Sequence, residues 1–189
     1  MKASEADIVI VPGFGDSGPD HWQSRWQSKL ASARRVDHDA WHEPDQEAWV
    51  AAIRRTIDAA QKPVVLVAHS LGIAATAQAL QDVKGKIAGA FLVSPPDLIV
   101  PRQLPSGLSL DQINAFGPYP RMPLPFPSIV VASQNDLHGS YEHAGDVANA
   151  WGSLLVDAGN SGHINVESGH GPWPEGTMVF AQFLSRLKP

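Results

Sequence analysis

Residues 64–77 read VVLVAHSLGIAATA, an apolar β-branched run followed directly by a run of small residues. The first part is typical of a buried strand and the second of a closely packed helix, so Ser70 lies at their junction. This context fits a sharp strand-to-helix turn that exposes a nucleophile, where the residues two before and two after it must be small. Ala68 and Gly72 meet that need, although glycine is common at both places. Serine is also a frequent helix N-cap, and that second interpretation stays open.

Short apolar runs alternate with segments of helical period along the rest of the chain. We expect strands at residues 8–11, 35–39, 64–68, 87–93, 129–132 and 154–156, and helices at residues 20–33, 45–60, 71–82, 141–151 and 175–187. This alternation is typical of a mostly parallel sheet covered by helices on both faces. The pattern predicts a three-layer α/β/α sandwich of one domain, residues 1–189, whose six strands have the order 2-1-3-4-5-6.

The stretch from Pro95 to Pro127 interrupts this alternation. It holds nine of the chain's 16 prolines and one helical turn, around Ser109–Phe116. We expect a long surface loop here. Such insertions often act as flaps over sites, and a plain surface linker is the alternative that the sequence leaves open.

Composition excludes several classes of function. The net charge is -5, and the 14 Lys and Arg are scattered along the chain, which argues against a nucleic-acid partner. The chain has no cysteine, so thiolate metal sites and cysteine nucleophiles are excluded. The first residues lack a signal-peptide core and no apolar run reaches the length of about 18 that a membrane span needs, so we expect a cytoplasmic protein. The histidines show no metal-ligand spacing, and we expect no bound metal.

The loop after the first strand offers a rival signal. Gly13, Gly15 and Gly18 match the dinucleotide fingerprint G-x-G-x-x-G. In such a site the third glycine lies inside the helix, but Gly18 precedes Pro19, and a residue before proline avoids helical geometry. We therefore expect the helix to begin after Asp20 as N-cap, which disfavours a nucleotide site.

The same loop can instead contribute to an oxyanion hole. If the predicted strand order is right, the ends of the first and third strands meet at the switch point where open sheets bind ligands. The backbone NH of Leu71 would be one donor and that of Phe14 the second, although Phe14 can equally be an ordinary loop aromatic. His69 should point away from Ser70, and we interpret it as structural.

An acid and a base are expected after later strands, in the order Ser, Asp, His. Asp136 follows the fifth strand by a short step and is the preferred acid, with Asp97 and Asp157 as rivals. The loop after the last strand offers two histidines. His163 lies nearer the strand end and is the preferred base, whereas His170 is interpreted as a loop residue or a substrate contact.

Several unusual sequence motifs are spread over nearly the whole chain. They are HWQSRW (residues 21–26), AHSLG (68–72), LPFPS (124–128), ND (135–136) and GHINVESGHGPWPEG (162–176). With these strings the chain resembles the retinoblastoma-binding-protein-9 and YdeN-like serine hydrolases. The resemblance implies a reduced α/β-hydrolase fold without the first hairpin, and a triad of Ser70, Asp136 and His163. Ala68, Leu137 and His170 depart from the family pattern, and the last departure leaves the choice of base open.

The sequence thus predicts a serine hydrolase that cleaves small acyl esters, thioesters or amides through an acyl-enzyme. Such a reaction requires no metal or organic cofactor, and the expected partner is a small acyl substrate. Two alternatives stay open. The first is a protein-binding module on a hydrolase scaffold, and the second is a dinucleotide-binding protein.

Overall fold

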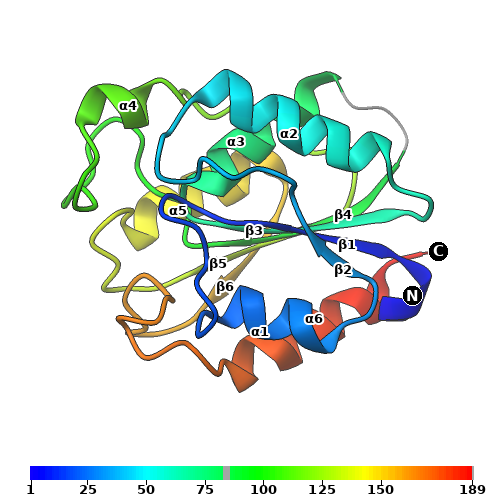
Figure 1. Ribbon diagram of the computed structural model, residues 1–189. Helices are drawn as coiled ribbons and strands as arrows, with labels where there is room; N and C mark the ends of the chain where they lie inside the picture. The colour runs from blue at the N-terminus through cyan, green and yellow to red at the C-terminus, as the bar shows by residue number, and fades with distance from the viewer. Residues whose placement is uncertain (83–85, 189) are drawn as a thin grey trace.

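The computed structural model describes residues 1–82 and 86–188 (Figure 1). Its six strands form one parallel sheet in the order β2-β1-β3-β4-β5-β6. The strands are β1 (Asp7–Val11), β2 (Ala33–Arg35), β3 (Val64–His69), β4 (Ile87–Val93), β5 (Ser128–Ala132) and β6 (Leu154–Asp157). The α-helices are α1 (Trp22–Lys29), α2 (Gln46–Asp58), α3 (Leu71–Ala79), α4 (Leu110–Asn114), α5 (Tyr141–Trp151) and α6 (Pro174–Arg186). The predicted fold class and strand order are confirmed.

Helices cover both faces of the sheet because alternate strand residues point to opposite sides. Val9 and Val11 of β1 pack in one cluster with α2, α3 and α5. Ile8 and Ile10 pack in the other, with α1 and α6. Figure 1 shows the two layers on either side of the sheet. All six residues of β3 are buried, so the strand that leads to Ser70 runs through the centre of the molecule.

Several predicted boundaries were wrong. The first helix ends at Lys29 instead of residue 33, because β2 already begins at Ala33. β2 ends at Arg35, where its pairing with β1 ends, instead of spanning residues 35–39 with their alternating charges. The N-cap of α1 is His21 rather than Asp20, because the His21 side chain accepts a hydrogen bond from the amide of Gln23. The helix expected to reach residue 82 ends at Ala79, and a 3-10 turn, η2 (Leu80–Asp82), follows. A second 3-10 turn, η1 (Ala3–Glu5), precedes β1.

The proline-rich segment 95–127 is more than a surface loop. α4 lies within this segment. The segment's side chains Leu98, Ile113 and Phe116 are buried in the same cluster as α2 and α3. The indole of Trp151 also donates to the carbonyl of Pro120 at 2.7 Å. The segment therefore contributes to the core as well as covering the end of the sheet.

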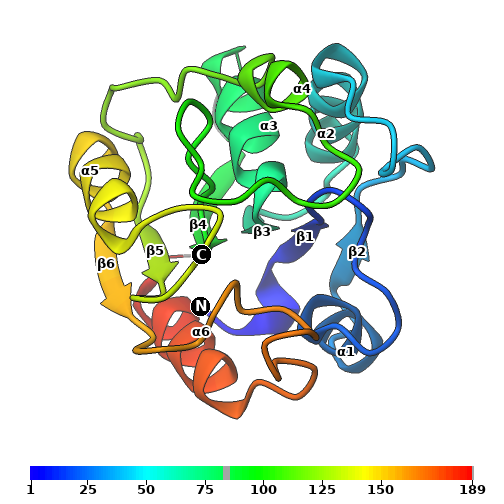
Figure 2. The ribbon, with the colours of Figure 1, turned by 90° about the vertical axis from the view of Figure 1, so that its left-hand side faces the viewer.

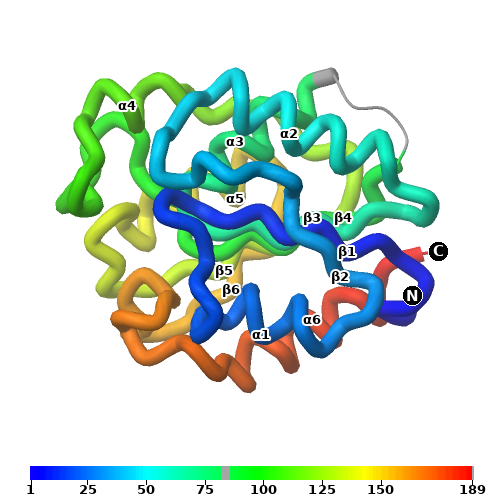
Figure 3. Tube along the Cα trace, viewed as in Figure 1, coloured from blue at the N-terminus to red at the C-terminus, as the bar shows by residue number. Residues whose placement is uncertain are grey.

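The carboxyl ends of the strands face the viewer in Figure 2, with the loops after β1 and β6 and the α4 segment gathered around them. Figure 3 shows both ends of the chain at the opposite edge, where the amino group of Met1 donates to the carbonyls of Leu184 and Leu187. Within residues 1–82 and 86–188, no helix combines the length and apolar character needed to cross a membrane.

Candidate active site

Ser70 occupies a strained turn between β3 and α3. Its φ of 52° lies in the left-handed region, which residues other than glycine rarely adopt. The turn brings α3 so close to the loop after β1 that a Cβ on Gly72 would lie 2.1 Å from the carbonyl oxygen of Pro12. A Cβ on Gly13 would lie 2.8 Å from that of Ser70. Glycine is thus required at both positions, and the turn presents Ser70 at the carboxyl edge of the sheet.

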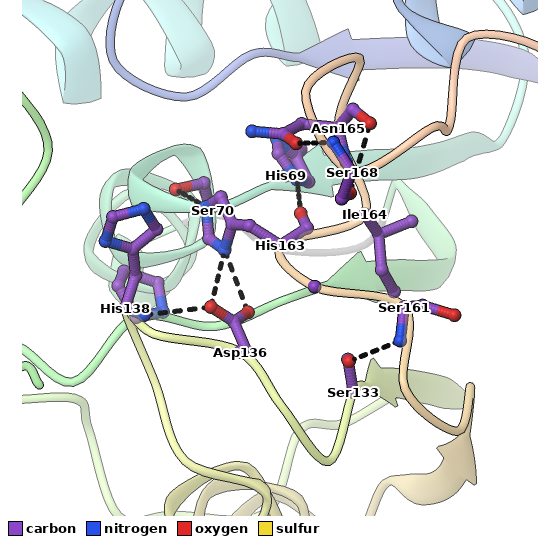
Figure 4. Close-up of polar contacts among 12 residues, drawn as sticks. His69, Ser70, Ser133, Asp136, His138, Ser161, His163, Ile164, Asn165 and Ser168 are labelled. Atoms are coloured by element: carbon purple, nitrogen blue, oxygen red, sulfur yellow. Dashed lines mark hydrogen bonds and ion pairs between the residues drawn. The ribbon is translucent and has the colours of Figure 1, made fainter. Parts of the chain in front are cut away.

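The three side chains predicted from the sequence lie in a continuous hydrogen-bonded row (Figure 4). The hydroxyl of Ser70 lies 2.8 Å from Nε2 of His163. On the other side of the ring, Nδ1 lies 2.8 and 3.0 Å from the two carboxylate oxygens of Asp136. With Nδ1 protonated and donating to Asp136, Nε2 is the acceptor for the Ser70 proton, as a general base requires.

Asp136 is 2% exposed and would be costly to bury as an isolated charge. Besides the bond from His163, its Oδ1 accepts the backbone NH of His138 at 2.9 Å. These partners fix the carboxylate against the imidazole, so it can hold the ring in one tautomer.

The loop that carries His163 is held at two successive carbonyl groups. The buried ring of His69 donates from Nε2 to the carbonyl of His163 at 2.9 Å. The indole of Trp22 donates to the carbonyl of Ile164 at 2.9 Å. Ile164 has a φ of 47°, which a β-branched residue adopts only when its surroundings impose it. Burial lowers the pKa of His69 well below its ordinary value, so its ring is neutral.

The first turn of α1 also links the two central strands β1 and β3. Gln23 is fully buried, and its side-chain amide donates to the carbonyl of Val11 at 3.0 Å and of Val67 at 3.1 Å. Val11 is the last residue of β1, and Val67 lies two residues before the end of β3. Next to it, burial and the nearby Arg35 lower the pKa of His21 to about 4.

Two backbone amides near Ser70 are available to an oxyanion. Leu71 is the first residue of α3, where a helix has no internal partner for its NH. Gly13 lies against Ser70, which brings the neighbouring Phe14 to the same cavity. Among the described residues, neither amide donates a hydrogen bond. Both can therefore bind a negative oxygen.

His138 is a residue that the sequence reasoning missed. Its ring meets the ring of His163 edge-on, with 4.5 Å between centroids. Nδ1 donates to the carbonyl of Gln103 at 2.7 Å, which leaves Nε2 as an acceptor beside the base. Burial, and then the neighbouring His163, lower the pKa of His138, so the ring is neutral. Its position two residues after the acid was the available signal.

The rival residues make other contacts, although Asp97 lines a small cavity that also includes Ser70. Asp97 accepts the amides of Ile99 and Val100. The carboxylate of Asp157 accepts from the side chain of Gln134 at 2.7 Å. His170 contacts Ser168 and Trp173 and lines a different cavity from those that include Ser70. None of the three contacts His163 among the described residues.

A cleft of about 580 Å³ opens above the row, with Ser70, His163 and His138 among its walls. The glycines of the rival dinucleotide motif line it too, but Gly18 precedes α1 and lies outside the helix. In the described part of the chain, no group of three or more His, Asp or Glu side chains is arranged to hold a metal ion.

The chain is similar to known proteins over nearly its full length. The model of a family described as serine hydrolase matches residues 8–182. A solved structure from Pectobacterium atrosepticum, described as a YdeN-like hydrolase, is 36% identical, with 99% of this chain and 95% of that chain covered and a TM-score of 0.84. No curated protein matches the chain.

More distant structures share the fold. The ydeN gene product of B. subtilis is 21% identical, covering 96% of this chain and 100% of its own, with a TM-score of 0.75. Est1E from Butyrivibrio proteoclasticus, solved with ferulic acid bound, is 14% identical over 93% of this chain and 88% of its own, with a TM-score of 0.62. The predicted YdeN-like resemblance is confirmed, and its retinoblastoma-binding-protein-9 part stays a prediction.

Proposed function

The chain belongs to the serine hydrolase family, and we propose that it cleaves small acyl esters with Ser70 as nucleophile, His163 as base and Asp136 as the acid that orients the base. Thioesters and amides are substrates of the same chemistry. The observation that carries the proposal is the row of hydrogen bonds from Asp136 through His163 to Ser70, with distances of 2.8 Å at both links.

In the first step, the Ser70 oxygen attacks the acyl carbonyl while its proton moves to Nε2 of His163. The amides of Leu71 and Phe14 stabilise the oxyanion, and each such donor typically contributes about 100- to 1,000-fold in rate. The bond to the leaving group then breaks, and His163 returns the proton to that group. The products of this step are the acyl-enzyme and a free alcohol, thiol or amine.

Water completes the cycle. His163 removes a proton from it, the hydroxide attacks the acyl-enzyme, and the bond to Ser70 breaks as the proton returns to the serine oxygen. Asp136 stabilises the imidazolium at both stages and keeps its own charge. These steps balance without a metal or an organic cofactor.

The first experiment is labelling with a fluorophosphonate, which reacts with activated serines. We expect one adduct per folded chain, on Ser70, and none in the Ser70→Ala variant or in unfolded protein. A binding module on an inactive scaffold, the alternative function, would leave the native chain unlabelled. Esters, thioesters and amides with the same acyl group then identify the bond that is cleaved.

A further inference from the structure

Two cavities of different character meet at Ser70. The smaller has a volume of about 10 Å³, which is space for roughly one water or methyl group. Its exposed lining is mostly apolar, although Asp97, Gln103 and His138 also border it. Leu71 and Phe14 line this cavity, as do Leu108 and Ile113 of the segment 95–127. The larger is the cleft of about 580 Å³, which includes His163.

The chemistry of the reaction assigns each cavity to one half of the substrate. His163 must give a proton to the departing group, so the leaving-group atom lies on its side, in the larger cleft. The carbonyl oxygen turns toward the amides of Leu71 and Phe14. The acyl chain is then directed into the smaller cavity.

From this arrangement we propose that the substrate is a short acyl ester of a larger, polar alcohol, and that Leu108 and Ile113 limit the acyl length. The inference rests on the proposed function and adds its substrate class. A two-carbon acyl group places one methyl past the carbonyl, which matches this space, whereas longer chains must displace these two side chains.

The part of the wall that α4 contributes is packed and anchored. Ile113 is 2% exposed, and the buried Phe116 just after α4 lies edge-on against Trp49, with 5.2 Å between ring centroids. Ser109 and Gln112 form a capping box that fixes the start of α4. Since close-packed side chains resist displacement, a longer acyl chain cannot be accommodated cheaply.

The walls of the larger cleft favour a polar leaving group. The carboxylate of Glu167 lies exposed on its rim, and Nε2 of His138 is a hydrogen-bond acceptor beside His163. Asn165 adds an amide side chain. Hydroxyl groups of an alcohol such as glycerol can donate to these acceptors, and an alkyl chain cannot.

The acyl limit is tested with glycerol 1-monoesters of two, four, six and eight carbons. We expect kcat/KM of the unaltered enzyme to peak at two carbons and to fall at least about tenfold at eight. Ile113→Ala should move the optimum to longer chains. Leu110→Ala is the matched control, because Leu110 is exposed on the same helix and outside the cavity. Leu108→Ala gives a second test should Ile113→Ala fail to fold.

Reversed esters test the assignment of sides. Glycerol 1-butyrate carries its diol on the alcohol, and propyl 3,4-dihydroxybutanoate carries it on the acyl group. We expect at least about tenfold higher kcat/KM for the first. Equal rates, or an unchanged optimum in both cavity variants, would overturn the inference while fluorophosphonate labelling of Ser70 still supported the hydrolase. Absence of labelling would instead remove the proposed function.

Discussion

The indole nitrogen of Trp22 donates to the carbonyl of Ile164, the residue directly after His163, at 2.9 Å. The donor is in the first turn of α1 and the acceptor is 142 residues later. His69 binds the preceding carbonyl, so the two donors together hold the backbone on which the base sits. This gives the unusual string around Trp22 a role in positioning, because a shift of about 1 Å in a catalytic group can cost about 100-fold in rate.

We expect Trp22→Phe to lower kcat about tenfold with little change in KM. Phenylalanine keeps most of the ring packing but removes the NH that holds Ile164, so His163 is held less firmly. Steady-state kinetics with one ester, together with the rate of fluorophosphonate labelling, measure the effect on Ser70 reactivity.

Trp26→Phe is the matched control. Trp26 stacks in the same aromatic cluster, with 4.8 Å between its ring centroid and that of Trp22, and within the described residues its indole has no hydrogen bond to the His163 loop. Both variants should lose similar thermal stability, and only Trp22→Phe should lose kcat. Equal losses of kcat would assign Trp22 a purely structural role.

The choice of base is tested by His163→Ala and His170→Ala. His163→Ala should reduce kcat nearly as far as Ser70→Ala, because triad members act as a unit. His170→Ala should keep most of the activity, since His170 bonds to Ser168 and lines a cavity that does not include Ser70. An inactive His170→Ala beside an active His163→Ala would reverse the assignment and leave the hydrolase reaction intact.

The sequence was sufficient for the sheet order and for the elements that follow a strong local period. Its candidate triad followed from the order of Ser70, Asp136 and His163 relative to the strands, and these three side chains lie in contact. The errors in the prediction concerned the bounds of single elements. β2 is a short edge strand with little apolar pattern, and the N-cap of α1 depended on a single side-chain bond.

Other features of the site depend on long-range contacts that no local pattern records. The bond from His69 to the carbonyl of His163 joins residues 94 apart in the sequence. The ring of His138 lies against the base while its Nδ1 binds the carbonyl of Gln103, 35 residues earlier. The proline-rich segment has no period, so the burial of Ile113 could not be read from its spacing.

Gly72→Ala should destabilise the fold and abolish activity. The added methyl would overlap the backbone of Pro12, 2.1 Å away, and backbone cannot move aside as a side chain can. We expect a loss of about 1–3 kcal/mol or more in the free energy of unfolding. Gly18→Ala is the control, because nothing lies within 4 Å of its added Cβ, and its change should stay within about 0.5 kcal/mol. Urea unfolding followed by fluorescence measures both, and equal stability of the two variants would contradict this account of the turn.

The buried histidines predict how stability depends on pH. The pKa of His21 is lowered to about 4, first by burial and then by Arg35, whereas an unfolded histidine has a pKa near 6.5. Between these values the unfolded chain binds the proton and the folded chain does not, so the free energy of unfolding falls as the pH drops from about 6.5 to 4. The shift corresponds to roughly 3 kcal/mol at the acid end. The lowered pKa of His69 acts in the same direction.

His21→Asn isolates one part of this effect. Asparagine is a good N-cap, and its side-chain oxygen can accept the amide of Gln23 as Nδ1 of His21 does, but it takes up no proton. Urea unfolding at pH 7, 5.5 and 4.5 should therefore give a smaller loss of stability for His21→Asn than for the unaltered protein. His42→Asn, at an exposed histidine, is the control for the loss of an imidazole. If His21→Asn loses stability on acidification as steeply as the unaltered chain, then His21 takes up its proton in the folded state at an ordinary pH and its burial does not limit acid stability.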